Sequence, residues 1–290
     1  MMSERENKQK TLAIVGLGLI GGSLARAAKR CGGYTVLGMD LDKKTCEAAL
    51  CDGAVDRMIG EDCLSEADFV FVCLHPRAAL SFLLEKQTLF RKGSVVLDVC
   101  GIKTYVVEGM KEGFTRTDVT FVGAHPMAGR EFSGYFASQE NLFDGASLIL
   151  TPDGAEEGVL CELKELASDL GFGKVVLATP EEHDRIIAFT SQLAHVVSSA
   201  YVKSPSLLDE KGFSAGSFQD LTRVAKLDSK LWCDLFLLNK KPLISEIDCM
   251  IERLKEYRAA IMAGDQVTLT TLLDDGTRLK LLSLESEKRD

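Results

Sequence analysis

A glycine-rich segment near the N-terminus places the strongest constraint on the fold. Residues Gly16-Leu-Gly18-Leu-Ile-Gly21 follow an apolar run over 11–15, typical of a buried parallel strand, and precede a helix-like run over 22–30. In this pattern the first glycine permits a tight turn, and the second lets backbone amides approach a pyrophosphate at the helix N-terminus. The pattern predicts a dinucleotide-binding βαβ unit. The expected contacts come from Gly16, Gly18, Leu19, Ile20 and Gly21.

The next strand-like run, over 35–39, ends at an acidic residue. Asp40 stands nineteen residues after Gly21, the spacing at which a carboxylate accepts hydrogen bonds from the adenosine ribose. A carboxylate at this point also repels a 2′-phosphate. We therefore predict NAD rather than NADP as the cofactor.

Strand-like and helix-like runs alternate through the first half of the chain. Further strands are predicted at 68–74, 94–99, 119–122, 147–150 and 174–177, with helices at 43–51, 75–84, 103–112 and 156–170. This order predicts an α/β fold, with an N-terminal Rossmann-type domain over residues 1–178 that holds a doubly wound, mostly parallel sheet. The long, poorly periodic segment 129–145 is interpreted as a wall or lid over a site.

Strand patterns cease near Pro180, and an all-helical domain is predicted over residues 179–290. One long helix is expected over 181–202, shorter ones over 218–225 and 229–239, and two terminal helices over 243–261 and 266–284. The terminal helices carry wide apolar stripes, which a homodimer would bury. The same stripes are also consistent with packing only on each other and on the first domain.

Composition narrows the class of protein further. The net charge of −9 argues against nucleic-acid and anionic-membrane partners, and no apolar run is long enough to cross a membrane. The nine cysteines contain no C-x-x-C pair, which favours a reducing, cytoplasmic location and argues against a metal site. Because the chain is acidic overall, an anionic substrate must be bound by individual arginines.

The predicted strand over 119–122 leads into Gly123-Ala-His-Pro-Met-Ala-Gly-Arg-Glu131. His125 is thereby placed at the carboxyl end of a strand, where ligands bind in open α/β sheets. A histidine there can exchange a proton near neutral pH. His75, followed by Pro76, also ends a strand and is a rival for this role, although the strand order would put it beside the cofactor.

The chain resembles the prephenate dehydrogenase (TyrA) family over almost its whole length, through several motifs that occur in the same order and spacing. They are the glycine loop continuing to Ser23, the segment 97–103, His125-Pro-Met-Ala-Gly129, His183-Asp, the helix over 191–195, Asp220-Leu-Thr-Arg223, and Trp232. The resemblance implies NAD-dependent oxidative decarboxylation of prephenate to 4-hydroxyphenylpyruvate in tyrosine biosynthesis, with hydride passing to NAD.

The resemblance also implies roles for individual residues. His125 would accept the proton of the substrate hydroxyl, and Arg223 would hold a substrate carboxylate near His195, so that these three form the expected catalytic set. Glu131 would help to organise the site, whereas Arg130 is interpreted as a solvated surface arginine. The remaining residues expected at the substrate are Gly216, Asp220, which would orient Arg223, and Trp232.

One departure and three alternatives accompany this interpretation. Many family members carry serine where this chain has Gly101, so the hydrogen bond of that serine must come from elsewhere or be absent. Arogenate dehydrogenase, with the same chemistry on an amino-acid side chain, is not separated by the sequence. A dehydrogenase of the β-hydroxyacid group and a non-enzymatic NAD-sensing protein are more distant alternatives.

Overall fold

The computed structural model describes residues 9–130 and 132–287. The chain forms two compact units, one ending at Asn239 and the other beginning at Lys240. The last strand of the sheet ends at Leu177, next to the domain boundary expected from the sequence at 178. That boundary stays a prediction, because the helices that follow the sheet as far as Asn239 belong to the same compact unit as the sheet.

The first unit is built on an eight-stranded sheet with the order β3-β2-β1-β4-β5-β6-β7-β8. Only β6 and β7 pair antiparallel, which confirms the mostly parallel α/β fold. Because β7 follows β6 without an intervening crossover α-helix, the chain can reverse its direction there. The strands are β1 (Lys10–Val15), β2 (Tyr34–Met39), β3 (Arg57–Met58), β4 (Phe69–Val72), β5 (Val95–Asp98), β6 (Thr120–Pro126), β7 (Ser147–Thr151) and β8 (Lys174–Leu177).

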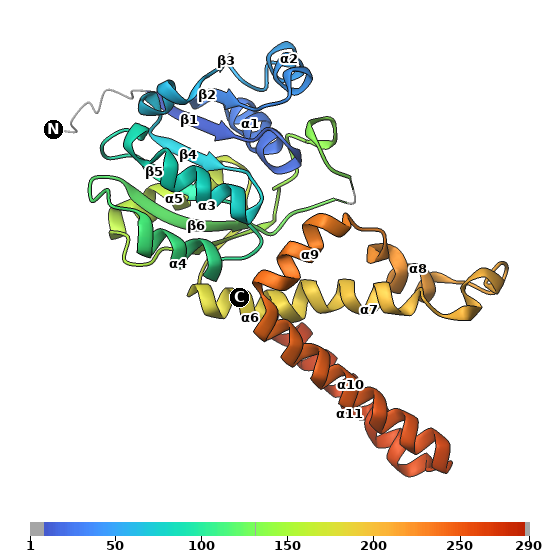
Figure 1. Ribbon diagram of the computed structural model, residues 1–290. Coiled ribbons are helices and arrows are strands. Elements are labelled where there is room, and N and C mark those ends of the chain that lie inside the picture. The colour runs from blue at the N-terminus through green and yellow to red at the C-terminus, as the bar shows by residue number, and fades with distance from the viewer. Residues whose placement is uncertain (1–8, 131, 288–290) are drawn as a thin grey trace. The chain divides into compact units, whose positions relative to one another are not determined.

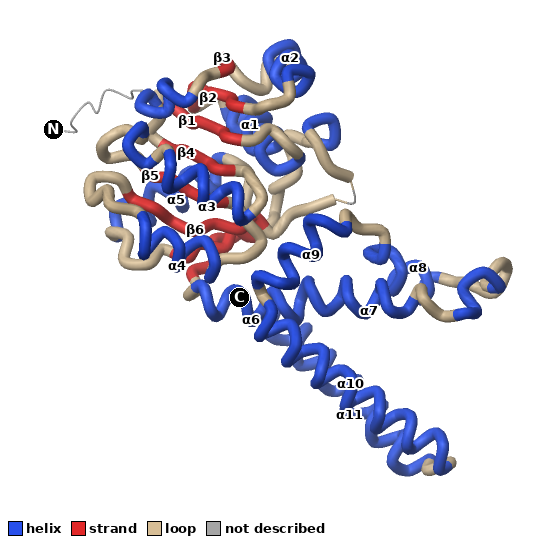
Figure 2. The backbone as a smooth tube through the Cα atoms, in the orientation of Figure 1, coloured by secondary structure: helices blue, strands red, loops and turns tan. Residues whose placement is uncertain are grey.

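Helices cover both faces of this sheet, as Figures 1 and 2 show. Helices α1 (Leu19–Cys31) and α5 (Glu157–Asp169) bury their apolar residues in one core cluster. Helices α3 (Pro76–Glu85) and α4 (Thr104–Gly113) contribute to the other. Helix α2 (Lys43–Cys51) lies beside β2 and β3. Since both faces are covered, central strands such as β4 and β5 are buried along their whole length and read as continuous apolar runs.

The segment between β6 and β7 is anchored to helix α1 in its second half. Tyr135 is buried, Arg26 Nε donates to Ser138 Oγ at 3.0 Å, and the backbone N–H of Gln139 donates to Ser23 Oγ at 3.0 Å. These contacts hold residues 135–139 against α1, and the role of the segment as a wall or lid over a site stays a prediction. The expected site residue Glu131, in the first half of this segment, lies outside the described residues.

A continuous helical run follows the sheet, in agreement with the long helix expected over 181–202. It consists of α6 (Pro180–Ile187), a π-helical segment (Ala188–Leu193) and α7 (Ala194–Tyr201). The π-helical segment was not anticipated from the sequence, and such segments are frequent at functional sites. Two shorter helices complete the unit, α8 (Gly216–Thr222) and α9 (Ser229–Leu238).

The second unit is a pair of long helices, α10 (Lys240–Ala263) and α11 (Gln266–Glu287). Gly264 connects them with a positive φ of 62°, and Tyr257 Oη donates to the carbonyl of Leu272 at 3.1 Å. Large apolar side chains remain exposed on both helices, Leu254 by 60% and Leu273 by 55%. In the part of the chain that the structure describes, no helix combines the length and apolar character that a membrane span requires.

Candidate active site

The turn after β1 and the first turn of α1 each contain one position that admits only glycine. Gly16 has a φ of 88°, and a Cβ added there would lie 2.6 Å from the carbonyl oxygen of Cys73. A Cβ at Gly21 would lie 1.9 Å from the carbonyl oxygen of Gly16. The backbone of the loop and the first turn of α1 are therefore packed against each other and against the end of β4 without room for side chains.

Gly18 has the opposite environment. It is the N-cap of α1, makes no side-chain cap hydrogen bond, and has no neighbouring atom within 4 Å of an added Cβ. The backbone at Gly18, which precedes Leu19 and Ile20, thus adjoins open space at the positive end of a helix dipole. An anionic pyrophosphate fits this arrangement, as predicted from the glycine pattern.

Asp40 follows β2 and is tied to the same loop. Its Oδ2 accepts from the backbone N–H of Leu17 at 2.7 Å, and its Oδ1 accepts from that of Asp42 at 2.9 Å. These bonds hold the carboxylate beside the glycine turn. Each carboxylate oxygen has a second lone pair for a further donor, so Asp40 can still accept a hydrogen bond from a ribose hydroxyl. The glycine loop, the start of α1 and Asp40 together provide the groups that NAD binding requires.

His125 lies at the carboxyl end of β6 and is joined to a second histidine. His125 Nδ1 lies 2.8 Å from Nε2 of His183 on α6, and His183 Nδ1 lies 2.7 Å from Asp184 Oδ1. Oδ1 and Oδ2 of Asp184 accept from the backbone N–H groups of Lys103 at 2.8 Å and Thr104 at 2.9 Å. The three side chains form a connected hydrogen-bonded row.

Burial sets the protonation of this row. Desolvation lowers the pKa of His125 well below its ordinary value, and the nearby His183 and Lys103 lower it further. Burial acts to raise the pKa of Asp184, but the hydrogen bonds from His183, Lys103 and Thr104 outweigh it and hold that pKa below its ordinary value. At neutral pH His125 is therefore a neutral imidazole and Asp184 is a carboxylate.

A buried lysine ties the ends of β5 and β6 together. Lys103 Nζ forms an ion pair with Asp98, the last residue of β5, and donates to the carbonyl of Ala124 at 2.6 Å. Both charged side chains are fully buried. Because Ala124 directly precedes His125, this contact fixes the backbone that carries the imidazole.

Gly101 lies on the open side of His125. A Cβ at Gly101 would lie 3.7 Å from Nε2 and 3.8 Å from Cε1 of His125, and no other atom stands among its near neighbours within 4 Å. The imidazole edge that faces away from His183 is thus turned toward residue 101. A side chain at residue 101 would make ordinary van der Waals contact with that edge.

A second group of predicted residues gathers on α7, α9 and the turn after α8. The rings of His195 and Trp232 stack with centroids 3.7 Å apart, and His195 Nδ1 lies 2.9 Å from the carbonyl oxygen of Ser191. Desolvation lowers the pKa of His195; the bond to Ser191 raises it, and the charge of Arg223 lowers it again. That electrostatic effect puts Arg223 in the same neighbourhood.

The two groups are connected by one helical run. His183 and His195 are twelve residues apart along α6, the π-helical segment and α7, which corresponds to a rise of about 18 Å. Arg223 follows directly after α8, whose first residue is Gly216 and whose exposed side chains include Asp220. The sequence thus placed His195, Trp232 and Arg223 in one group, and the structure brings them together.

The rival histidine lies near Asp228, at the start of α9, and no hydrogen bond joins it to His125 among the described residues. His75 is exposed and caps the N-terminus of α3, and Arg130 is also exposed. Sequence reasoning assigned no role to His183, Asp184 or Lys103, although the His183-Asp pair and the buried lysine after a strand were visible as signals. Among residues 9–130 and 132–287, no group of three or more His, Cys, Asp or Glu side chains is placed to hold a metal ion.

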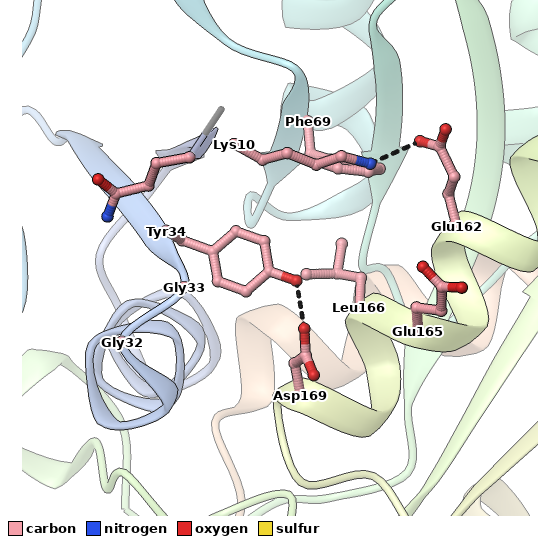
Figure 3. Close-up of a pocket in the computed structure, with 10 residues that line it drawn as sticks. Lys10, Gly32, Gly33, Tyr34, Phe69, Glu162, Glu165, Leu166 and Asp169 are labelled. Atoms are coloured by element: carbon pink, nitrogen blue, oxygen red, sulfur yellow. Dashed lines mark hydrogen bonds and ion pairs between the residues drawn. The ribbon is translucent and has the colours of Figure 1, made fainter. Parts of the chain in front are cut away.

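A cavity lies at the amino ends of the strands, on the opposite side of the sheet from the glycine loop. It has a volume of about 470 Å³ and is lined by the first residues of three strands, Lys10, Tyr34 and Phe69. Figure 3 shows Lys10 paired with Glu162 and Tyr34 bonded to Asp169 across it. Because ligands of parallel sheets bind at the carboxyl ends of strands, this cavity is not the dinucleotide site.

Comparison with known proteins agrees with this geometry. The family model for the nucleotide-binding domain of prephenate dehydrogenase matches residues 24–185, and that for its dimerization domain matches 179–275. The chain is 32% identical to cyclohexadienyl dehydrogenase of Zymomonas mobilis over 88% of this chain and 90% of that protein.

Solved structures of two relatives superpose on nearly the whole chain. Prephenate dehydrogenase from Aquifex aeolicus, in complex with hydroxyphenyl propionate and NAD+, has a TM-score of 0.83 at 28% identity, over 95% of this chain and 98% of the other. Arogenate dehydrogenase from Synechocystis has a TM-score of 0.80 at 28% identity, over 93% and 99%. This protein is an NAD-dependent oxidoreductase. The chain belongs to the prephenate dehydrogenase family.

Proposed function

We propose that this enzyme oxidises prephenate to 4-hydroxyphenylpyruvate and carbon dioxide, with His125 as the general base. The observation that carries the proposal is the environment of His125. Its Nδ1 is occupied by His183, whereas its Nε2 edge faces the open position at Gly101. A half-buried neutral imidazole with one nitrogen available is the group that proton removal from a hydroxyl requires.

The proton and electron movements balance as follows. The O–H bond of the ring hydroxyl breaks as an N–H bond forms at His125 Nε2, and the carbon that bears the hydroxyl loses hydride. NAD, when bound at the glycine loop and Asp40, supplies the hydride acceptor. The bond between the ring and its carboxylate then breaks, carbon dioxide leaves, and its electron pair completes the aromatic ring. The ring oxygen takes the proton back from His125 Nε2, which gives the phenol and restores the neutral imidazole. His125 has to be neutral at the start, which its lowered pKa ensures at neutral pH.

The carboxylates of the substrate need donors, and Arg223 is proposed as the principal one. A guanidinium offers two parallel N–H groups to a carboxylate. His195 and Trp232 lie beside it, stacked on one another, so that an imidazole and an indole form an ordered surface next to the cation. Gly216 and Asp220, on the preceding helix, are proposed to shape this end of the pocket, and Glu131 to organise the loop after His125.

We propose that two copies of the chain associate through the helical region. The match to a dimerization-domain model over 179–275 supports a dimer, and the exposed apolar side chains of α10 and α11 supply surface for it. Burial of such side chains is the usual driving force for stable subunit contacts. Sedimentation equilibrium over a range of protein concentrations would measure the association directly.

Arogenate is the second candidate substrate, because the Synechocystis relative is an arogenate dehydrogenase and the Zymomonas relative is a cyclohexadienyl dehydrogenase. The decisive experiment measures NADH formation by absorbance with prephenate and with arogenate, side by side, with His125→Asn as the control for the chemistry. A higher kcat/KM with prephenate is expected. A clear preference for arogenate would replace the proposed substrate, and no NADH with either would reject the reaction class.

A further inference from the structure

The row of side chains behind His125 determines which imidazole nitrogens carry hydrogen. Asp184 is a carboxylate, which can only accept, so the His183 nitrogen facing it at 2.7 Å has to donate. Nδ1 of His183 therefore carries hydrogen, and with that single hydrogen on its ring His183 presents a lone pair at Nε2. The contact of 2.8 Å between that lone pair and His125 then requires hydrogen on Nδ1 of His125. Nε2 of His125 is left with its lone pair.

Asp184 is held so that it cannot turn away from this row. Two backbone N–H groups, from Lys103 and Thr104, donate to its carboxylate. Asn239 Nδ2 donates to the backbone carbonyl of Asp184 at 2.8 Å and to Gln192 Oε1 at 2.8 Å. Asp184, Gln192 and Asn239 are all buried. The start of α4 thus orients the carboxylate, and the residue after α9 holds the backbone that carries it.

His125 is anchored independently of its ring. Lys103 links its backbone neighbour, Ala124, to Asp98, while the backbone N–H of the same lysine orients Asp184. One residue thus sets the position of both ends of the row. The ring of His125 meets that of His183 edge to face, with centroids 5.0 Å apart, so the contact between the two nitrogens is directional.

We infer that His183 and Asp184 are positioning residues that hold His125 in the tautomer with hydrogen on Nδ1 and so leave Nε2 as the basic nitrogen. This inference rests on the proposed function, in which His125 is the base. The same row stabilises His125 once it has taken up a proton, because His183 continues to accept from Nδ1 and Asp184 carries the opposite charge. Positioning by a buried carboxylate through hydrogen on an imidazole is an established catalytic arrangement.

The direct test is ¹⁵N NMR of the imidazole rings in the intact enzyme at neutral pH. The chain has only four histidines, so the signals of His125 and His183 are assigned with His125→Asn and His183→Gln. We expect a protonated Nδ1 and an unprotonated Nε2 in both residues. Hydrogen on Nε2 of His125, or an even mixture of its two tautomers, would overturn the inference without any activity measurement.

Two substitutions of His183 test whether the row is needed. In His183→Gln the side-chain oxygen can accept from His125 while the amide donates to Asp184, so the tautomer and most of the turnover are expected to persist. In His183→Leu no acceptor remains, and His125 Nδ1 loses its partner in a buried site. We expect mixed tautomers and a fall in kcat of roughly 10- to 100-fold, the effect of leaving one buried donor unpaired.

Arg185→Leu is the matched control, because it introduces the same residue on an exposed face of α6. Thermal unfolding and NAD titration show whether a variant has lost its fold. If it has, the His125 tautomer in the wild-type NMR spectrum tests the inference instead. Unchanged turnover in a folded His183→Leu enzyme would overturn the inference. If His125→Asn retains turnover while the NMR tautomers are as expected, the proposed base is wrong but the positioning of His125 stands.

Discussion

Replacement of His125 by asparagine tests the proposed chemistry most sharply. The amide of asparagine reaches the position of Nδ1 and can still donate to His183, but no atom remains at the position of Nε2. The contact behind the ring is therefore kept, while the basic nitrogen that faces Gly101 is lost. General base catalysis contributes about 10²–10⁴-fold, so kcat should fall by that factor, which corresponds to about 2.7–5.4 kcal/mol in the activation barrier.

The dependence of kcat on pH provides a second measurement on the same variant. Because burial lowers the pKa of His125 below 6.5, its ordinary value, the imidazole stays neutral to lower pH, and the acidic limb of the wild-type profile should lie below pH 6.5. The residual activity of His125→Asn should lack that limb. Turnover near the wild-type level, or an unchanged acidic limb, would show that another group is the base.

The free energy of unfolding should also fall as the pH falls. The unfolded chain binds a proton at His125 below about pH 6.5, whereas the folded chain binds it only below the lowered pKa. Between these two values the unfolded state holds more protons, so His125 reduces the free energy of unfolding by up to about 1.4 kcal/mol per unit fall in pH. Urea unfolding of wild type and His125→Asn between pH 7 and pH 5 should reveal the difference. Parallel pH dependences in the two proteins would contradict the buried, neutral state.

Three further substitutions address the remaining parts of the site. Arg223→Ala should raise KM for prephenate by about 10- to 100-fold and leave the affinity for NAD unchanged, since the substrate carboxylate loses its partner while the glycine loop and Asp40 are untouched; an unchanged KM removes Arg223 from the pocket. Asp40→Ser should narrow the preference for NAD over NADP by at least about tenfold in kcat/KM, because the charge that repels a 2′-phosphate is gone; equal use of both cofactors by the wild type would contradict the placement of Asp40. Gly101→Ser should fold normally, because its Cβ meets only His125 at contact distance, and kcat should rise by up to about tenfold if the new hydroxyl bonds to Nε2 or the substrate; a large loss of kcat would show that the space is needed by the substrate.

Much of the fold could be predicted from the sequence because its signals are local. The glycine loop, the strand before it and the helix after it follow one another within about twenty residues, and steric limits on the backbone dictate each of them. The continuous apolar runs of β4 and β5 likewise indicate strands covered on both faces. The two-residue strand β3 and the π-helical segment carry no such local signal and were found only in the structure.

The candidate site, too, could be predicted only in part from the sequence. The sequence indicated His125 by its place at a strand end, whereas the resemblance to prephenate dehydrogenases indicated Arg223, His195 and Trp232. It could not show that His183 contacts His125, because 58 residues separate them, or that the backbone of Lys103 orients Asp184, 81 residues away. Such contacts depend on how α6 packs against the carboxyl ends of β5 and β6. Residue types and their order are encoded locally, whereas the tautomer of the base is decided by burial and by partners that only the tertiary structure brings within hydrogen-bonding distance.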